Sequence, residues 1–175
     1  MDFIIKAIYK NITKIRRYFI DMDEEQKKRY HLLKEKNKRR LSDENWKNNT
    51  LFQECIDCFN NFEILSLEST EEIFNRLVES FPITFYGSID WSKFNGIINT
   101  EGMPYLYQTL NLKNKYYILW DMQDTPAIIC DLFTILNNIY DVLAVSFNTW
   151  LLSLNENEII EFYHGSKVTY GKLQK

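Results

Sequence analysis

The stretch Leu143–Gly171, LAVSFNTWLLSLNENEIIEFYHGSKVTYG, decides the fold of this chain. Apolar and polar residues alternate along it, a polar break falls at residues 155–157, and a Gly-containing turn falls at residues 164–166. A period of two that is interrupted by turn residues is typical of antiparallel strands joined by hairpins. We therefore predict an antiparallel β-meander that is rich in Tyr, Phe and Trp.

The period of two extends back from the meander as far as Pro82. Runs of β-branched and aromatic residues bounded by turn residues predict further strands in this region. The predicted elements are a strand or hairpin over residues 83–91 around Gly87, strands over residues 116–120 and 126–130, and a short helix over residues 131–139 that Asp131 caps.

Helices are predicted before Pro82. Thr50 forms a capping box with Gln53 ahead of one apolar helical pattern, and Ser69 forms another ahead of a second pattern, with Glu72 as its partner. Pro82 ends the second helix because it disfavours the helical conformation for the residue before it. Helices followed by strands predict an α+β fold, with N-terminal helices packed against one face of a mostly antiparallel β-sheet.

Charges divide unevenly along the 175-residue chain. Residues 1–47 hold 14 Lys and Arg against 8 Asp and Glu, a net charge of +6, whereas residues 48–175 hold 7 against 16, a net charge of −9. Ile and Phe recur at helical spacing among the basic residues of the first part, which is typical of amphipathic helices. We therefore predict a basic helical segment over residues 1–47 and an acidic α+β domain over residues 48–175.

Two features of the sequence bear on where the protein works. No run approaches the roughly 20 apolar residues that a membrane-spanning helix needs. Residues 1–20 also lack the apolar core and the cleavage site of a signal peptide. We therefore expect no transmembrane segment and a cytoplasmic location.

The three cysteines are Cys55, Cys58 and Cys130. Cys55 and Cys58 lie three residues apart in a predicted amphipathic helix, and free cysteines are among the most often buried residues. We expect all three to be buried, reduced thiols, with metal or redox work by the Cys-x-x-Cys pair as the alternative. No second Cys or His pair completes a zinc site, so we expect no metal.

Motifs of a catalytic apparatus are missing from the sequence. The chain has two His, no Gly-x-Ser-x-Gly element and only 5 scattered Gly, which cannot form a phosphate-binding loop. We therefore predict a binding protein rather than an enzyme, and no cofactor.

Tryptophans of the predicted strands have two interpretations. Trp91, Trp120 and Trp150 either pack in the core or stack on nucleic-acid bases. A base-stacking sheet needs surrounding Lys and Arg to hold phosphates, and a net charge of −9 repels them. We therefore expect no direct nucleic-acid partner for residues 48–175.

Four segments carry a resemblance to a known family. They are FPITFYGSIDW (residues 81–91), YYILWDMQDTPAIICDL (116–132), DVLAVSFNTWLLS (141–153) and EIIEFYHGSKVTYG (158–171). Over about half of the chain, they resemble the immunity proteins of bacterial contact-dependent growth inhibition systems. The resemblance implies a small cytoplasmic protein that binds and neutralises the C-terminal toxin domain delivered by a neighbouring cell.

The resemblance also implies what the toxin-binding surface contains. Many such toxins are nucleases, which are basic because they hold phosphates. An inhibitor of a basic toxin should therefore present carboxylates and aromatic rings. The candidate toxin-binding residues are Asp90, Trp91, Asp121, Asp124, Glu156, Glu158 and Glu161.

These candidates also have ordinary interpretations. The carboxylates at residues 121–124 and 156–158 would then be solvated loop charges, and Trp91 would fill the core. Glu161 alternates with Ile160 and Phe162, so we expect its side chain on the solvent face of its strand.

A different function is also compatible with the charge pattern. The basic helices between Lys6 and Lys47 could bind nucleic acid or an anionic membrane surface. The alternative to an immunity protein is therefore a nucleic-acid-associated or membrane-surface adaptor that acts through the N-terminal helices.

Overall fold

The structure is a computed structural model that describes residues 28–29, 32, 45–122, 124–163 and 167–174. The chain divides into two compact units, Met1–Ser42 and Asp43–Lys175, and the description below concerns the second unit. The predicted basic helices and the predicted turn at residues 164–166 lie outside the described residues, apart from residues 28–29, 32 and 45–47. The division of the chain after residue 47 therefore stays a prediction.

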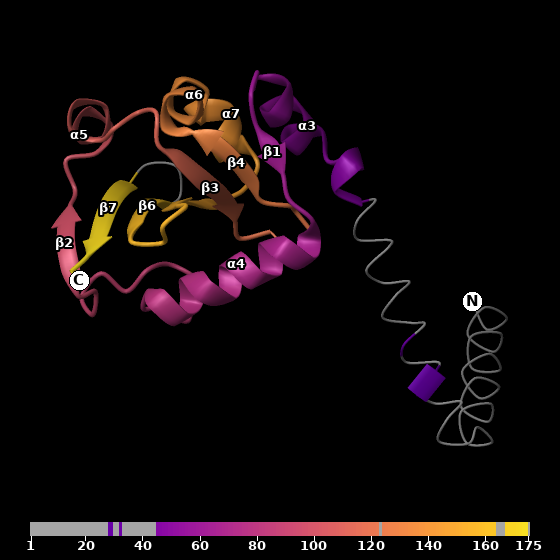
Figure 1. Cartoon of the computed structure of the whole chain (residues 1–175), viewed down its shortest axis with the longest axis horizontal. Coiled ribbons are helices and arrows are strands. Elements are labelled where there is room, and N and C mark those ends of the chain that lie inside the picture. Colours follow the sequence, from indigo (N-terminus) through magenta and orange to yellow (C-terminus); the bar gives the residue numbers. More distant parts are fainter. Residues whose placement is uncertain (1–27, 30–31, 33–44, 123, 164–166, 175) are drawn as a thin grey trace, which may run out of the picture. The chain divides into compact units, whose positions relative to one another are not determined.

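Within the described residues, seven strands form one sheet in the order β1-β4-β3-β5-β6-β7-β2 (Figure 1). Every neighbouring pair is antiparallel. β5, β6 and β7 are neighbours both in the chain and in the sheet, so the predicted meander is confirmed. The strands are β1 (Glu63–Ile64), β2 (Gly96–Asn99), β3 (Lys115–Trp120), β4 (Ile128–Asp131), β5 (Asn148–Ser153), β6 (Glu158–Tyr163) and β7 (Lys167–Leu173).

Helices of the second unit pack on the sheet, which confirms the α+β class. They cover both faces, whereas the sequence predicts one covered face: α3, α5, α6 and α7 pack on the first face, and α4 packs on the second. The helices are η1 (Trp46–Asn48), α3 (Thr50–Asp57), α4 (Leu67–Ser80), α5 (Met103–Thr109), α6 (Leu132–Asn137) and α7 (Ile139–Ala144).

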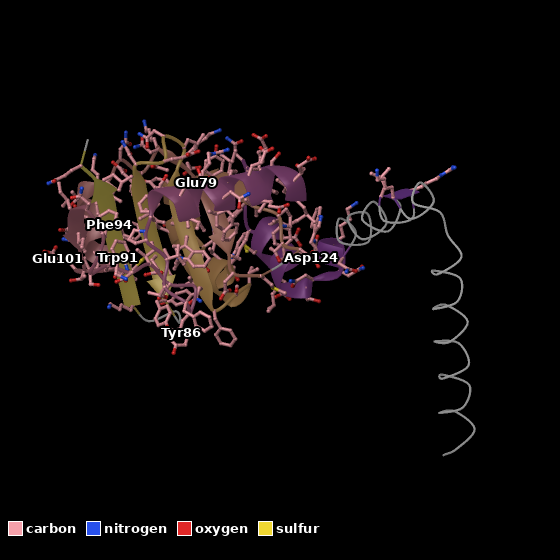
Figure 2. The ribbon with its side chains drawn as sticks, turned by 90° about the horizontal axis from the view of Figure 1, so that it is seen from below. Glu79, Tyr86, Trp91, Phe94, Glu101 and Asp124 are labelled. Atoms are coloured by element: carbon pink, nitrogen blue, oxygen red, sulfur yellow. The ribbon has the colours of Figure 1, made fainter. Side chains whose placement is uncertain are left out.

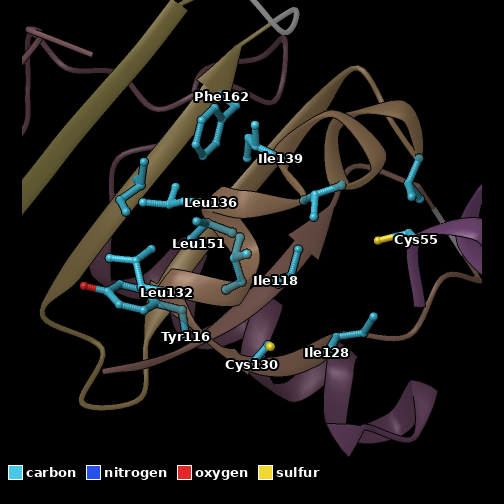
Figure 3. Close-up of a cluster of buried hydrophobic side chains, with 14 of the residues drawn as sticks. Cys55, Tyr116, Ile118, Ile128, Cys130, Leu132, Leu136, Ile139, Leu151 and Phe162 are labelled. Atoms are coloured by element: carbon cyan, nitrogen blue, oxygen red, sulfur yellow. The ribbon is translucent and has the colours of Figure 1, made fainter. Parts of the chain in front are cut away.

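Alternation along the strands divides their side chains between these two faces. Ile118 of β3 pairs with Leu151 of β5, and Figure 3 shows both side chains in the core of the first face. Leu151 pairs in turn with Ile160 of β6, and all three side chains are buried in this core. One residue further along each strand, the side chains point to the second face. There they contact a second core, to which α4 contributes Ile73 and Leu77.

Helix caps differ from the predicted ones at two of three positions. Asn49, not Thr50, caps α3, because its Oδ1 accepts from the Phe52 N–H at 3.2 Å. Ser66 caps α4, and its Oγ accepts from the Ser69 N–H at 3.0 Å, so the predicted cap lies inside the helix. The predicted cap at Asp131 is confirmed by its hydrogen bond from the Thr134 N–H at 2.9 Å.

The three cysteines are free thiols, and two of them are buried. Burial raises the pKa of Cys55 to about 12 and that of Cys130 to about 11, so both stay protonated at neutral pH. The prediction of a buried thiol is wrong for Cys58, which is exposed. α3 ends at Asp57, so Cys58 lies at the C-cap rather than on the buried face of the helix.

In the part of the chain that the structure describes, no helix has the length and apolar character that crossing a bilayer requires.

Thr70 joins α4 to Ala127, the residue before β4, and supplies a test of the second core. Its Oγ1 donates to the Ser66 carbonyl at 2.9 Å and accepts from the Ala127 N–H at 2.8 Å. Thr70→Val keeps the shape but leaves this buried N–H without an acceptor, so we expect the free energy of unfolding to fall by about 1–3 kcal/mol. Urea denaturation measures the change. Thr70→Ser keeps the hydroxyl and should lose less; equal losses in the two variants would contradict the assignment.

Candidate binding site

Glu161, in the middle of β6, is buried with 3% of its surface exposed. Its Oε1 accepts from the Ile89 N–H at 2.7 Å and from Trp150 Nε1 at 3.1 Å, and its Oε2 accepts from Trp91 Nε1 at 2.6 Å. Three N–H donors compensate for the loss of water around a buried carboxylate. The expectation that Glu161 faces solvent is therefore wrong, because another part of the chain covers this face of the sheet.

The part that covers Glu161 is residues 81–95, here called the covering segment. Its Phe81 and Phe94 rings stack at 5.9 Å between centroids. The Trp91 ring meets Phe94 edge-on at 5.3 Å, and Figure 2 labels these two residues next to each other. Trp91 lies so close to β7 that a Cβ on Gly171 would come within 2.5 Å of its ring. Trp91 therefore fills the second core, which supports the ordinary interpretation of this candidate.

A tight turn interrupts the covering segment at residues 84–88, here called the aromatic turn. Ile83 and Ile89 form a single antiparallel bridge, so the hairpin predicted around Gly87 is confirmed in this minimal form. The Thr84 N–H donates to the Ser88 carbonyl at 2.7 Å, and Gly87 has a φ of 81°, which favours glycine. Backbone hydrogen bonds and Gly87 therefore define the shape of the turn, and the side chains at its tip are not needed for it.

The tip of the aromatic turn consists of Phe85 and Tyr86, which are 98% and 81% exposed. Their rings contact each other edge-on at 5.6 Å between centroids. Figure 2 shows Tyr86 at the periphery of the domain, away from the labelled rings of Trp91 and Phe94. Phe85 and Tyr86 are not among the candidates predicted from the sequence. Their position directly before Gly87, a typical turn residue, is the signal that they lie at a hairpin tip.

Asp90 follows the aromatic turn and is partly exposed. Its Oδ2 forms an ion pair with Lys93 Nζ at 2.8 Å, and its Oδ1 accepts from Ser92 Oγ at 2.5 Å. These hydrogen bonds from Lys93 and Ser92 lower the pKa of Asp90. The carboxylate is therefore ionised at neutral pH, with Lys93 offsetting its charge.

Asp121 and Asp124 lie in the loop between β3 and β4, and both are exposed. The carboxylate of Asp121 accepts from Ser146 Oγ and from Asn148 Nδ2, the latter at 2.8 Å, and thereby holds the start of β5. Asp124 has a φ of 67°, a conformation that Asp tolerates better than most residues. The β3–β4 loop is therefore an acidic part of the surface, and hydrogen bonds of Asp121 connect it to the start of β5.

Glu156 and Glu158 lie at the opposite end of the sheet, because the β5–β6 turn follows Ser153, which pairs with Tyr116 near the start of β3. Glu156 forms an ion pair with Arg76 of α4 at 2.7 Å. Glu158 accepts from the Tyr116 hydroxyl at 3.0 Å and forms an ion pair with Lys172 at 2.7 Å. Both carboxylates are therefore engaged within the domain.

The seven candidates consequently form three groups rather than one cluster. Asp90, Trp91 and Glu161 belong to the covering segment and its attachment. Asp121 and Asp124 lie at one end of the sheet, and Glu156 and Glu158 lie at the other. Among the described residues, no three His, Cys, Asp or Glu side chains come together as a metal site. Two exposed features close to these groups are the aromatic turn and the acidic β3–β4 loop.

The chain matches a known protein family. The family model described as "CdiI immunity protein EcoliA0-like" matches residues 49–171, which is more than half of the chain. No curated protein matches the chain. The match includes every strand up to β6, most of β7, and the whole of the covering segment.

Glu161→Gln tests the attachment of the covering segment. Gln places an amide NH₂ opposite N–H donors and has no charge, so we expect the free energy of unfolding to fall by about 2–3 kcal/mol. Gln keeps only one of the two oxygens, and Trp91 and Trp150 bond different ones, so at least one of them loses its acceptor. The tryptophan emission of the folded protein should therefore also shift to longer wavelength. Glu79→Gln, on the exposed surface of α4, is the matched control. A Glu161→Gln protein with unchanged stability and emission would contradict the role given to the carboxylate.

Tyr116 supplies a test at alkaline pH. Burial and the charge of Glu158 raise the pKa values of Tyr116 and Tyr170 in the folded protein. The unfolded chain therefore releases these protons first, near pH 10, and stability falls as the pH rises above about 10. Tyr116→Phe should make this fall less steep by about 1.4 kcal/mol per pH unit, measured by urea denaturation across the alkaline range. Equal slopes for both proteins would contradict the assignment.

Proposed function

Because the chain belongs to the CdiI immunity protein family, we propose that it binds one cognate toxin domain in the cytoplasm and neutralises it by direct protein–protein contact. The observation that carries this proposal is the family match over residues 49–171, which spans almost the whole described domain. The protein acts by binding, and its own residues perform no catalytic step.

A basic nuclease is the proposed class of toxin. Residues 48–175 carry a net charge of −9. Among the Lys and Arg side chains that the structure describes there, Arg76, Lys93 and Lys172 are paired with carboxylates of the same domain. A nuclease must expose Lys and Arg to hold phosphates. The acidic domain therefore complements such a toxin, speeds its association through long-range attraction, and disfavours acidic partners.

The proposed toxin-binding surface contains the exposed carboxylates among the candidates. Asp121 and Asp124 are the strongest, because the β3–β4 loop presents both of them to solvent. Asp90 contributes less charge, since Lys93 offsets it. Glu156 and Glu158 supply negative charge only at the opposite end of the sheet, where Arg76 and Lys172 offset it.

Binding to the toxin domain encoded beside this chain's own gene tests the proposal. We expect a tight complex of the two purified proteins, and co-expression should restore growth to cells that produce the toxin. The dissociation constant should rise by about tenfold or more between about 0.05 M and 0.5 M salt, because salt screens the attraction between exposed charges. Titration calorimetry at several salt concentrations measures this change.

The matched control is a toxin domain of another family that is encoded elsewhere, which should not bind. If the adjacent toxin neither binds nor is neutralised, the proposed function is wrong. If the toxin binds with an affinity that does not depend on salt, the proposed immunity function is supported, but the proposal that the toxin has a basic surface is wrong.

A further inference from the structure

On the basis of the proposed function, we propose that the aromatic turn is the anchor that inserts into a concave, cationic site of the toxin domain. The turn comprises residues 84–88, with Phe85 and Tyr86 at its tip. Neither ring belongs to either core of the domain, and the two rings contact one another.

The exposure of this pair is not required by the fold. Gly87 and the hydrogen bonds of Thr84 and Ser88 set the shape of the turn, so small polar residues at positions 85 and 86 would fit it equally well. Two adjacent aromatic rings nevertheless remain in water, at a cost that burial in a partner would remove. The tip is therefore suited to a partner rather than to the domain itself.

The aromatic turn is also rigidly attached. The Ile83–Ile89 bridge closes its base, and the Asp90 N–H donates to the Pro82 carbonyl at 2.7 Å just below it. Glu161 then holds the Ile89 N–H at 2.7 Å. An anchor that is already ordered loses little conformational freedom on binding, so more of the contact energy appears as affinity.

The strand register places the aromatic turn at the same end of the sheet as the β3–β4 loop. Trp91 lies against Gly171, which pairs with Ile159 of β6, whereas Ile89 is bound to Glu161, two residues further along β6. The covering segment therefore runs along β6, and its turn lies toward Tyr163. Asn148 pairs with Tyr163 and is bound to Asp121, so the β3–β4 loop lies at this same end.

These surroundings define the chemistry of the partner. A convex tip with two rings fits a concave site, and the faces of Phe and Tyr attract Lys and Arg side chains. Asp121 and Asp124 add negative charge at the same end of the sheet. A phosphate-binding cleft of a nuclease domain combines concavity with Lys and Arg, so the anchor would occupy the place of the toxin's substrate.

The double variant Phe85→Ala with Tyr86→Ala tests the anchor. The control is Tyr140→Ala, which removes an aromatic side chain of α7 that is 86% exposed. We expect the double variant to bind the toxin at least about 30-fold more weakly, as for a hot-spot residue, and Tyr140→Ala to bind within about twofold of the unchanged protein. Calorimetric titration measures both affinities, and circular dichroism confirms that each variant is folded.

A second measurement uses the unchanged protein and does not depend on the folding of a variant. Hydrogen exchange at residues 84–88 should slow when the toxin domain binds. A short single-stranded RNA in place of the toxin should leave this exchange unchanged, and protection by RNA would overturn the proposal in favour of a nucleic-acid site.

The results separate the two proposals. If the unchanged protein does not bind the toxin, the proposed function fails. If it binds while the double variant keeps full affinity, or while exchange at residues 84–88 stays the same, the immunity function stands and the anchor is wrong.

Discussion

The second half of this domain depends on one buried carboxylate. Glu161 bonds Ile89, Trp91 and Trp150, and so joins the covering segment to the middle of the sheet. A buried carboxylate is costly without partners, and this one has three N–H donors. Because those donors come from two separate parts of the chain, neither the position of Trp91 nor that of the aromatic turn is independent of this side chain.

Carboxylates in this domain serve two purposes. Glu161, Glu158 and Glu156 bind groups of the domain itself and thereby hold the sheet, its turn and the covering segment together. Asp121 and Asp124 lie exposed in one loop, where Asp121 also binds Asn148 at the start of β5. The net charge of −9 in residues 48–175 is therefore a poor guide to any single interface residue, although it does describe the field that an approaching toxin meets.

Local patterns predicted most of the fold, and contacts between distant residues explain the errors. The meander and the Asp131 cap follow from alternation and a single side chain, both of which are local. The caps of α3 and α4 were misplaced because Asn49 and Ser66 lie within one turn of other polar residues that could accept the same kind of bond. For Glu161, alternation correctly predicted the face of the strand on which the side chain lies. It contained no information about the covering segment, whose Ile89 lies 72 positions earlier in the chain and binds Glu161. The same limit applies to the candidate site. The sequence indicates which acidic residues are candidates, but their division into groups at different places on the sheet follows from the strand register.

The local character of the meander has a consequence for the order of folding. β5, β6 and β7 need only short loops to meet, whereas the covering segment must close a much longer stretch of chain to reach Glu161. We therefore expect the carboxylate to be hydrated, on an open sheet face beside Trp150, until the covering segment docks. Docking of the covering segment is the step that removes this water, and a chain halted before it would present an apolar sheet face open to aggregation.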